Sequence, residues 1–590
     1  MNIYWKNPPI NMDFTTAGNW AQSEVPGAGD IAELTFSGGT AIVSAAAAVT
    51  VLGVNIGSGA TLHLAGNFTA TEGTPIGANR GTVEVDASFI AGGTLNNPGT
   101  LTISNGGQLR VAGGLDLTVK GSGTIGLALA GGISIEAGLS LTNVDNHIVG
   151  GGTILGSDTL INQKNGVIST TSAGPLTIDV TTKNQALIES TVDVSDLQIA
   201  SKVDNSSGGT VRAVGDSQVF LTDGADIIGG TLDAHGVGGQ FTTNGDVTID
   251  GSSAVVPTNK MITISGRIDV EGTLHLQGAI NNSGSIGLSG PSTRLVVQAA
   301  GTNNTTTLKG FGFISPDGNV IGAGSPVTLD NVNNTILSEV SGAIGGAGLK
   351  LKNEVGGTIN ANNRTLVIDT GANTVSNAGL MEVSADGTLV IASNLSNTGK
   401  LEANGGTIYA TGTVTGGTAI ITDLGSPGVV EFGAASTTAT KFAVGTTGQL
   451  IVADSAQYTG VISGFGSNTT QSIDLADFNF TGAHATSFSL GVLTLKNTAG
   501  QVVHLHFSGA HTLASFHLSD DGNFNGTDDG TKIVDPPAAM KPQTPINNLA
   551  SLFGQFMASW TNPSAGLTSQ LFSALATEVQ TAISLPHPHS

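Results

Sequence analysis

The amino-acid sequence predicts an all-β protein whose main part is an elongated β-solenoid (β-helix), a column of short strands wound in about twenty rungs. Three observations lead to this fold class. Turn-and-strand phrases recur at a spacing of about twenty residues, a longer phrase returns about 190 residues later, and the composition is rich in glycine and poor in charge. Repetition at such a period is typical of stacked architectures.

The composition describes a chain that folds but carries little charge. Of 590 residues, 86 are glycine, 11% are charged and 39% are hydrophobic, so there is ample apolar surface to bury. The formal net charge of −23 argues against nucleic acid and anionic membrane surfaces as partners, and it favours cations or other proteins. The absence of cysteine excludes disulfides, thiolate metal sites and cysteine nucleophiles.

The first recurring phrase is Asn-x-Gly followed by an alternating strand. It occurs at NPGTL (97–101), NSGSI (282–286), NAGLM (377–381) and NTGKL (397–401). We expect each copy to be a turn, because asparagine and glycine tolerate a positive φ. In the strand that follows the third copy, Met381 is predicted to point into the column and Glu382 away from it.

The second phrase is Gly-x-x-Leu followed by an alternating strand. It recurs at GATLHL (59–64), GGQLRV (106–111), GGTLDA (229–234), EGTLHL (271–276), DGTLVI (386–391) and TGQLIV (447–452). Two neighbouring copies of the first phrase, NAGLM and NTGKL, place Gly379 and Gly399 twenty residues apart. That length accommodates two or three short strands with their turns, which is one rung of a β-solenoid.

A longer echo supports the same architecture. LTNVDNHI (141–148) returns as LDNVNNTI (329–336), and PLTIDV (175–180) returns as TLVIDT (365–370), at offsets of 188 and 190 residues. Insertions at the corners of a stack would produce such a drift. With a rise of about 4.8 Å per rung, residues 37–453 would form a rod roughly 100 Å long. Its open sheet ends would polymerise unless they are capped or paired.

We expect residues 1–36 to cap the first rung. This segment holds Trp5 and Trp20, two of the three tryptophans, within the pattern W…GNW…PGAGD. The main interpretation is a plug of aromatic side chains, and the alternative is a site where tryptophan stacks on a sugar. The pattern resembles the opening of large secreted bacterial β-solenoid proteins, which implies the same fold and an extracellular location.

Residues 454–537 differ in character and predict a C-terminal β domain. From Tyr458 the chain reads YTGVISGFGSNTTQSIDLADFNF, and the region ends in SFHLSDDGNFNGTDDGTKIVDPP. It resembles the C-terminal region of proteobacterial proteins exported by type I secretion, relatives of the repeats-in-toxin group. The resemblance implies a type I ABC exporter as a partner during secretion. It does not extend to a calcium-loaded roll, because the tandem GGxGxDxUx nonapeptides of that group are missing.

Residues 538–590 are predicted to be a linker and a helical tail. Within 565–585, aliphatic residues recur at four-residue intervals and form one apolar helical stripe. The resemblance above implies an uncleaved secretion signal, and a helix that only docks on the domain is the alternative. The N-terminal residues lack the pattern of a cleavable signal peptide. The apolar run at 41–54 is too short to span a membrane, so we expect no membrane insertion.

Calcium is the one cofactor that the sequence indicates. The stretch DDGNFNGTDDG (520–530) places carboxylate and amide side chains around glycines, and such hard oxygen ligands suit Ca²⁺. The predicted ligands are Asp520, Asp521, Asn523, Asn525, Asp528 and Asp529. A polar turn without metal is the alternative, because the stretch lacks the terminal glutamate of an EF-hand. Asp474 and Asp477 are interpreted as turn residues, and further calcium ligands are the alternative.

The sequence contains no His-Glu-x-x-His, Gly-x-Ser-x-Gly or phosphate-binding loop motif. We therefore expect a protein without enzymatic activity, a secreted structural or adhesive protein of the bacterial surface or matrix. The favoured hypothesis is head-to-tail self-assembly into a filament or layer. A monomeric adhesin that binds host or glycan surfaces is the alternative. A β-helix polysaccharide lyase or hydrolase is a second alternative, which would need carboxylates beside Arg or Lys in a groove.

Overall fold

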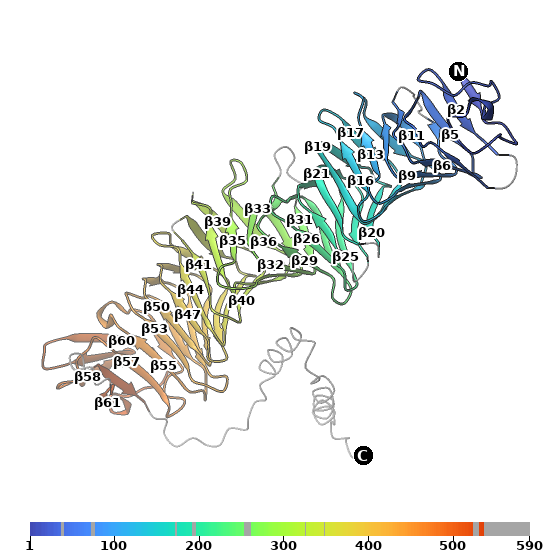
Figure 1. The fold of residues 1–590 in the computed structure, drawn as a ribbon. Coiled ribbons are helices and arrows are strands. Elements are labelled where there is room, and N and C mark those ends of the chain that lie inside the picture. Colours follow the sequence, from blue (N-terminus) through green and yellow to red (C-terminus); the bar gives the residue numbers. More distant parts are fainter. Residues whose placement is uncertain are drawn as a thin grey trace, which may run out of the picture. The chain divides into compact units, whose positions relative to one another are not determined.

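The computed structural model describes residues 1–535 apart from 37–39, 72–76, 172–173, 192–195, 253–260, 325, 347 and 523–529. The chain divides into two units, Met1–Pro536 and Pro537–Ser590, and the second lies outside the described residues together with the predicted helical tail. The first unit is a β-solenoid of about 19 turns, and strands make up 57% of the chain (Figure 1). The structure therefore confirms the predicted fold class and the number of rungs.

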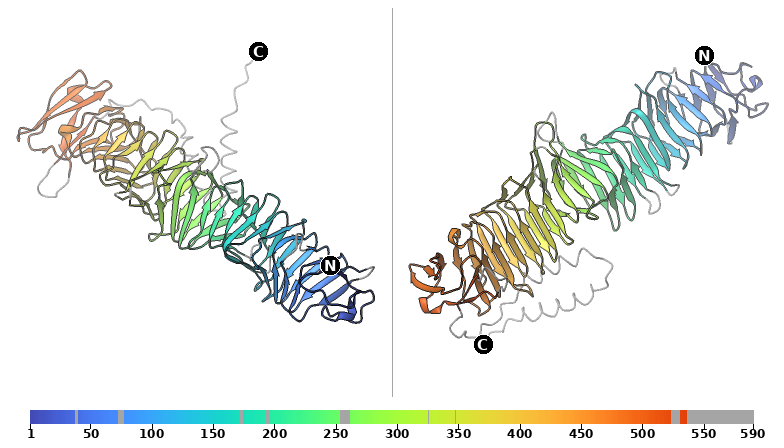
Figure 2. Two further views of the ribbon diagram at one scale, coloured as in Figure 1. Left: turned by 90° about the horizontal axis from the view of Figure 1, so that it is seen from above. Right: turned by 60° about the vertical axis from the view of Figure 1, so that its left-hand side comes forward.

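Through most of the column, each turn passes once through each of three parallel sheets, usually as three short strands. Two successive turns comprise β45 (Val375–Asn377), β46 (Leu380–Ser384), β47 (Thr388–Ile391), β48 (Leu395–Asn397), β49 (Lys400–Asn404) and β50 (Thr407–Ala410). Sheet 1 contains β46 and β49, sheet 2 contains β47 and β50, and sheet 3 contains β45 and β48. Leu380 is in register with Lys400, which confirms the period of twenty residues at this level. Figure 2 shows the stacked strands of the column from two further sides.

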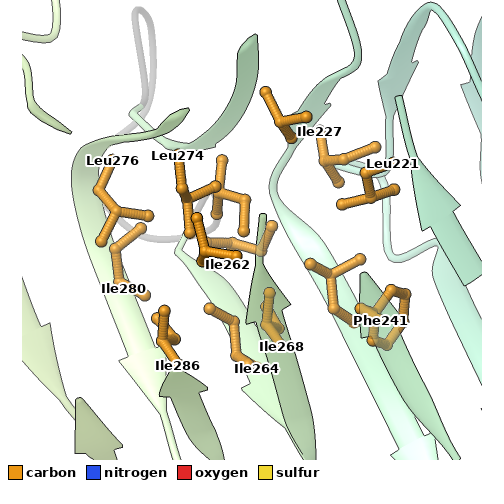
Figure 3. Packing of buried hydrophobic residues seen from close by; sticks show 14 of the residues in the cluster. Leu221, Ile227, Phe241, Ile262, Ile264, Ile268, Leu274, Leu276, Ile280 and Ile286 are labelled. Atoms are coloured by element: carbon orange, nitrogen blue, oxygen red, sulfur yellow. The ribbon is translucent and has the colours of Figure 1, made fainter. Parts of the chain in front are cut away.

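The core follows from the alternation of each strand. Met381 and Val383 of β46 and Leu389 and Ile391 of β47 have no exposed surface, whereas Glu382 lies on the outer face. Every turn adds comparable aliphatic side chains, each worth roughly 1.5–3 kcal/mol of burial. Figure 3 shows this packing for Leu221, Ile227, Phe241, Ile262, Ile264, Ile268, Leu274, Leu276, Ile280 and Ile286.

The Asn-x-Gly phrases are not the positive-φ turns predicted from the sequence. Asn377 and Gly379 do not adopt a positive φ, and the Asn377 side chain is fully buried at a corner of the column. Its Nδ2 donates to Asn397 Oδ1 on the next turn at 2.8 Å, and Asn353 Nδ2 donates to Asn377 Oδ1 at 2.8 Å. The asparagines thus form a buried ladder in which each side-chain amide donates to the oxygen of the next, up to Asn397, whose own Nδ2 has no partner within the described residues.

The glycine of the phrase is required by close packing of the backbone. A Cβ on Gly399 would lie 2.1 Å from the carbonyl oxygen of Gly379, one turn earlier. A Cβ on Gly379 would lie 2.2 Å from the carbonyl oxygen of Glu354. The corner therefore excludes side chains for a steric reason and not because of its φ angle.

The echo at 141–148 and 329–336 corresponds to one corner structure that occurs twice. In the first copy Asn143 Nδ2 donates to the Asn146 carbonyl at 2.9 Å and Asn146 N donates to Asn143 Oδ1 at 3.0 Å. Asn331 and Asn334 make the same two bonds at 2.9 and 3.0 Å. Each corner continues into a run of four asparagines on successive turns, Asn143–Asn162–Asn184–Asn205 and Asn331–Asn353–Asn377–Asn397. Asparagines of earlier turns lead into both corners, Asn79 and Asn97 into the first and Asn282 into the second.

The two ladders run along different corners of the column. The first lies where sheet 2 passes into sheet 3, because its asparagines precede sheet 3 strands such as β22 (Leu187–Ser190). The second lies where sheet 3 passes into sheet 1, because Asn377 ends β45 and precedes β46. The two halves of the column are therefore offset by one strand, a third of a turn.

The N-terminal end is closed by an aromatic cluster and a small sheet, which contains β1 (Asn2–Tyr4), β2 (Ile31–Leu34) and β5 (Gly53–Ile56). The rings of Trp5 and Trp20 contact each other edge to face with centroids 4.9 Å apart, and Trp20 Nε1 donates to the Phe14 carbonyl at 2.8 Å. Both indoles are buried, so neither offers a face to a sugar. This geometry is that of a plug over the first rung.

At the C-terminal end, strands add directly to the sheets of the column. The elements are β55 (Gly448–Val452), β56 (Val461–Ser463), β57 (Gln471–Leu475), β58 (His484–Ser489), β59 (Val492–Lys496), β60 (Val502–Ser508), β61 (His517–Asp520) and β62 (Thr531–Val534). β57 extends the sheet of β55 in parallel, but β62 pairs with β57 in the antiparallel sense. β58, β59 and β60 form an antiparallel meander. Parallel winding thus ends in antiparallel strands.

Helix is confined, within the described ranges, to three single-turn 3-10 segments, which are η1 (Ala17–Asn19), η2 (Ser455–Gln457) and η3 (Leu513–Ser515). In the described part of the chain, no helix has the length and apolar character needed to cross a membrane.

Candidate functional site

The predicted calcium site lies only in part within the described residues. Asp520 ends β61 and is exposed, and its Oδ1 accepts a hydrogen bond of 2.7 Å from the Gly522 amide. Asp521 N donates to the Gly530 carbonyl at 3.3 Å. The other four predicted ligands, Asn523, Asn525, Asp528 and Asp529, lie outside the described residues. Calcium binding by this stretch stays a prediction.

Asp474 is a strand residue and not the turn residue predicted from the sequence. It lies in β57 with 6% of its surface exposed, in register with Lys532 of β62. Burial and the charge of Asp521 raise the pKa of Asp474 to about 6, against the opposing effect of Lys532. Its partner in the prediction, Asp477, accepts the Ser455 amide at 3.0 Å, as expected of a turn residue. The described residues contain no group of three or more histidine and acidic side chains placed to hold a metal ion.

A hollow of about 500 Å³ opens on sheet 3 beside the first asparagine ladder. It crosses four successive turns, whose sheet 3 strands are β20 (Val167–Thr170), β22 (Leu187–Ser190), β25 (Thr210–Val214) and β28 (Gly230–His235). Its lining includes Val167 and Leu187, which are in register, together with Lys164, Arg212 and Asp233. The hollow therefore combines apolar and charged side chains.

Arg212 is held in place by Glu189, its neighbour on the previous turn. Arg212 Nε and Nη2 both donate to Glu189 Oε2, at 3.1 and 2.5 Å, and only 12% of the Glu189 side chain is exposed. Asp233, one turn further on in the same column, accepts a bond of 2.8 Å from Ser265 Oγ. Charged donors and acceptors thus alternate along the axis of the column.

A serine and a histidine lie next to the hollow, but the histidine is not placed to activate the serine hydroxyl as a nucleophile. His147 Nε2 lies 2.8 Å from Ser169 Oγ, and Ser169 is in register with Glu189. Burial lowers the pKa of His147, while the charge of Glu189 opposes that effect. Within the described ranges, no group bonds to His147 Nδ1, and Ser169 is almost fully buried. The arrangement lacks the oriented base and the accessible hydroxyl that acyl transfer needs.

The second half of the column carries a different set at the matching positions. Glu382 and Glu402 are in register on β46 and β49 of sheet 1, where the first half has Glu189 and Arg212. Both pairs follow asparagines of their ladders in the same order. The matching column therefore has two adjacent carboxylates where the hollow has an ion pair.

The hollow was not predicted from the sequence, because its lining residues come from four turns. The basic segment RIDV (267–270) lies elsewhere as β32 (Arg267–Val270), where Arg267 pairs with Asp269. A signal that leads to the hollow is the spacing of Glu189 and Arg212, 23 residues, about one turn of the repeat.

The edge of β1 at the N-terminal end is occupied. Ala21 N donates to the Tyr4 carbonyl at 2.7 Å. The Gln22 side chain accepts from Tyr4 N at 3.2 Å and donates to the Asn2 carbonyl at 3.2 Å. The segment that follows η1 therefore takes the backbone groups that a further strand would need.

Comparison with protein-family models gives no match, and comparisons with curated proteins and with solved structures give none either.

Proposed function

We propose that the protein is an extracellular structural and adhesive rod of a bacterial surface or matrix, without catalytic activity. The observation that carries the proposal is the uninterrupted solenoid of about 19 turns with an aliphatic core. Such a stack is stiff, and it offers long outer faces of small polar side chains on which partners can bind. The rod would hold a binding surface away from the cell.

Export by a type I ABC transporter is part of this proposal. Its support is the resemblance of residues 458–537 to the C-terminal regions of proteins exported in this way. Removal of residues 540–590 is expected to keep the protein inside the producing cell, and immunoblots of medium and cells measure the outcome. Undiminished secretion of the shortened chain would refute the assignment.

Within this class, the geometry favours a rod that acts through its sides. Ala21 and Gln22 occupy the outer edge of β1, which weighs against strand addition at that place. The test is a glycan and host-surface array with the full chain, together with electron microscopy. Specific binding by single, unpolymerised rods is the expected result. If the protein binds none of the surfaces on the array, the adhesive role is contradicted.

End-to-end assembly into a filament or layer is the second candidate. Within the described residues β58 pairs with β59 alone and β61 with β62 alone, so each leaves a strand edge at the C-terminal end. Electron microscopy with and without Ca²⁺ tests it, because the proposed calcium stretch directly follows β61. Monodisperse rods under both conditions would exclude this candidate.

A polysaccharide lyase or hydrolase is less well supported. The two carboxylates beside the hollow, Glu189 and Asp233, are engaged by Arg212 and Ser265 respectively. A hydrolase of this type needs one carboxyl group to donate a proton and a second to act as base or nucleophile. Incubation of the full chain with acidic and neutral polysaccharides, followed by size-exclusion chromatography, is expected to leave the polymer length unchanged.

A further inference from the structure

We propose that the hollow lined by Lys164 and Arg212 binds the carboxylates of a linear acidic polysaccharide. This inference rests on the adhesive function proposed above, and it names the binding surface and the ligand class. Three observations support the inference. They are the shape of the hollow, the exposure and hydrogen bonding of its two cations, and the residues at the matching positions of the second half.

The shape fits an extended chain. The hollow crosses four turns, and with strands about 4.8 Å apart it extends roughly 14 Å along the axis. Val167 and Leu187 in its lining are half-buried and apolar, so they suit the C–H face of a sugar ring. Gln185, Thr210 and Thr231 add groups to the lining that bond to hydroxyls. A polymer that runs along the column would contact each turn in succession.

The two cations are available for an anion. Lys164 is exposed and forms no ion pair within the described residues. Arg212 uses Nε and Nη2 for Glu189, which fixes the guanidinium plane, and within the described ranges Nη1 has no hydrogen bond. A planar guanidinium with a free edge is well suited to a carboxylate. Two carboxylates also lie beside the hollow, of which Glu189 is paired with Arg212 and Asp233 accepts from Ser265 Oγ.

The second half of the column indicates that the fold does not require these cations. Counted from the paired ladder asparagines, Val355 takes the place of Lys164 and Ala378 the place of Gln185. Glu402 takes the place of Arg212 by strand register. The same local structure therefore forms without a base at the positions of Lys164 and Arg212, although Lys400 takes the place of Thr210 by the same register. The fold itself does not require the two bases of the hollow, which leaves a ligand as the reason for them.

The test measures binding of the full chain to polygalacturonate by isothermal titration calorimetry, with dextran as neutral polymer and dextran sulfate as an anion without carboxylates. We expect binding to polygalacturonate that weakens with salt, and none to dextran. Lys164→Val, which introduces the residue of the second half, and Arg212→Gln should each lower the affinity about tenfold or more. Lys350→Val removes an exposed lysine on another turn and should stay within about twofold of the wild type.

Several results would overturn the inference. Affinities of the Lys164→Val and Arg212→Gln variants that equal the wild type would exclude this hollow, and equal binding of dextran would exclude recognition of carboxylates. Tighter binding of dextran sulfate than of polygalacturonate would indicate a general anion surface. Arg212→Gln leaves Glu189 without its partner, so its melting temperature is compared with the wild type, and Lys164→Val provides an independent result at an exposed position. Binding to other surfaces on the array, but to no uronate polymer, would refute this inference and leave the adhesive function in place.

Discussion

Glu382 lies in register with Glu402 on the next turn of sheet 1, and both side chains point away from the core. Burial and the charge of Glu402 raise the pKa of Glu382 to about 7. Asn360 Nδ2 donates a bond of 2.7 Å to Glu382 Oε1, which holds the carboxyl group at this position. Near neutral pH, Glu382 is therefore protonated in a large fraction of the molecules.

We expect the column to lose stability as the pH rises from about 5 to about 8. In the unfolded chain Glu382 titrates near its ordinary pKa of 4.5, and in the folded chain near 7. The folded state binds the proton more tightly, so this stabilisation is complete below pH 4.5 and is lost as the pH passes the folded pKa. The loss amounts to at most about 3 kcal/mol. The raised pKa of Asp474 acts in the same direction.

Thermal unfolding of Glu382→Gln at both pH values measures this effect. The variant should melt at a higher temperature than the wild type at pH 8 and should show a weaker dependence on pH. Glu271→Gln, at an exposed position, is the control and should follow the wild type. A wild-type melting temperature that is constant across this range would contradict the prediction.

Asn377→Ala should destabilise the column by about 1–3 kcal/mol, because it removes the two buried ladder bonds to Asn353 and Asn397 and the bond from Asn377 Nδ2 to the Lys400 carbonyl. Hydrogen exchange followed by mass spectrometry should reveal faster exchange in β45 and β48. Ser396→Ala changes the exposed neighbour of Asn397 and should have little effect. Equal exchange in the two variants would mean that the ladder contributes little.

Gly399→Ala should destabilise by about 1–3 kcal/mol or more, because its Cβ would lie 2.1 Å from the Gly379 carbonyl oxygen. Gly290→Ala is a matched control, since a Cβ there meets nothing within 4 Å and the residue has no positive φ. Chemical denaturation of both variants gives the comparison. Similar unfolding midpoints would refute the steric account of the Asn-x-Gly phrase.

Gln22→Ala should promote association of the rods, because it exposes the amide of Tyr4 and the carbonyl of Asn2 on the outer edge of β1. Analytical ultracentrifugation over a range of concentrations measures the effect. Glu24→Ala, at an exposed position two residues further on, should sediment as the wild type does. Unchanged sedimentation of Gln22→Ala would mean that the Ala21 contact closes the edge by itself.

Addition of Ca²⁺ to the full chain should release heat in calorimetry, and replacement of Asp520 and Asp521 by asparagine should weaken that binding about tenfold or more, because two anionic ligands are lost. Asp454→Asn provides a control at another acidic position. A wild-type chain that takes up no Ca²⁺ would favour the alternative of a polar turn.

The fold was predictable because the strands and turns of a solenoid produce local sequence patterns, namely alternating apolar residues and a regular repeat period. The inward positions Met381 and Leu389 and the twenty-residue step from Leu380 to Lys400 follow from alternation and period alone. The role of Asn377 was not predictable in this way. The same Asn-x-Gly letters are typical of a positive-φ turn, and only the structure places the asparagine side chain inside the corner.

The hollow could not be predicted, because its residues become neighbours only through strand register. Lys164 and Asp233 are 69 positions apart along the chain, and insertions at the corners change the length of each turn. For the same reason, nothing local distinguishes Asp474 in a strand from Asp477 in a turn, although only the first is buried beside Asp521.

The offset between the two asparagine ladders has a consequence for how such a chain grows. If the second half arose by duplication of the first, the duplicated surfaces are rotated by a third of a turn about the column axis. They are therefore not aligned with the corresponding surfaces of the first half. A duplicate placed in this way turns its outer residues toward a different side of the column, so the two copies cannot both face one flat target. On that side Glu402 stands where the first half has Arg212.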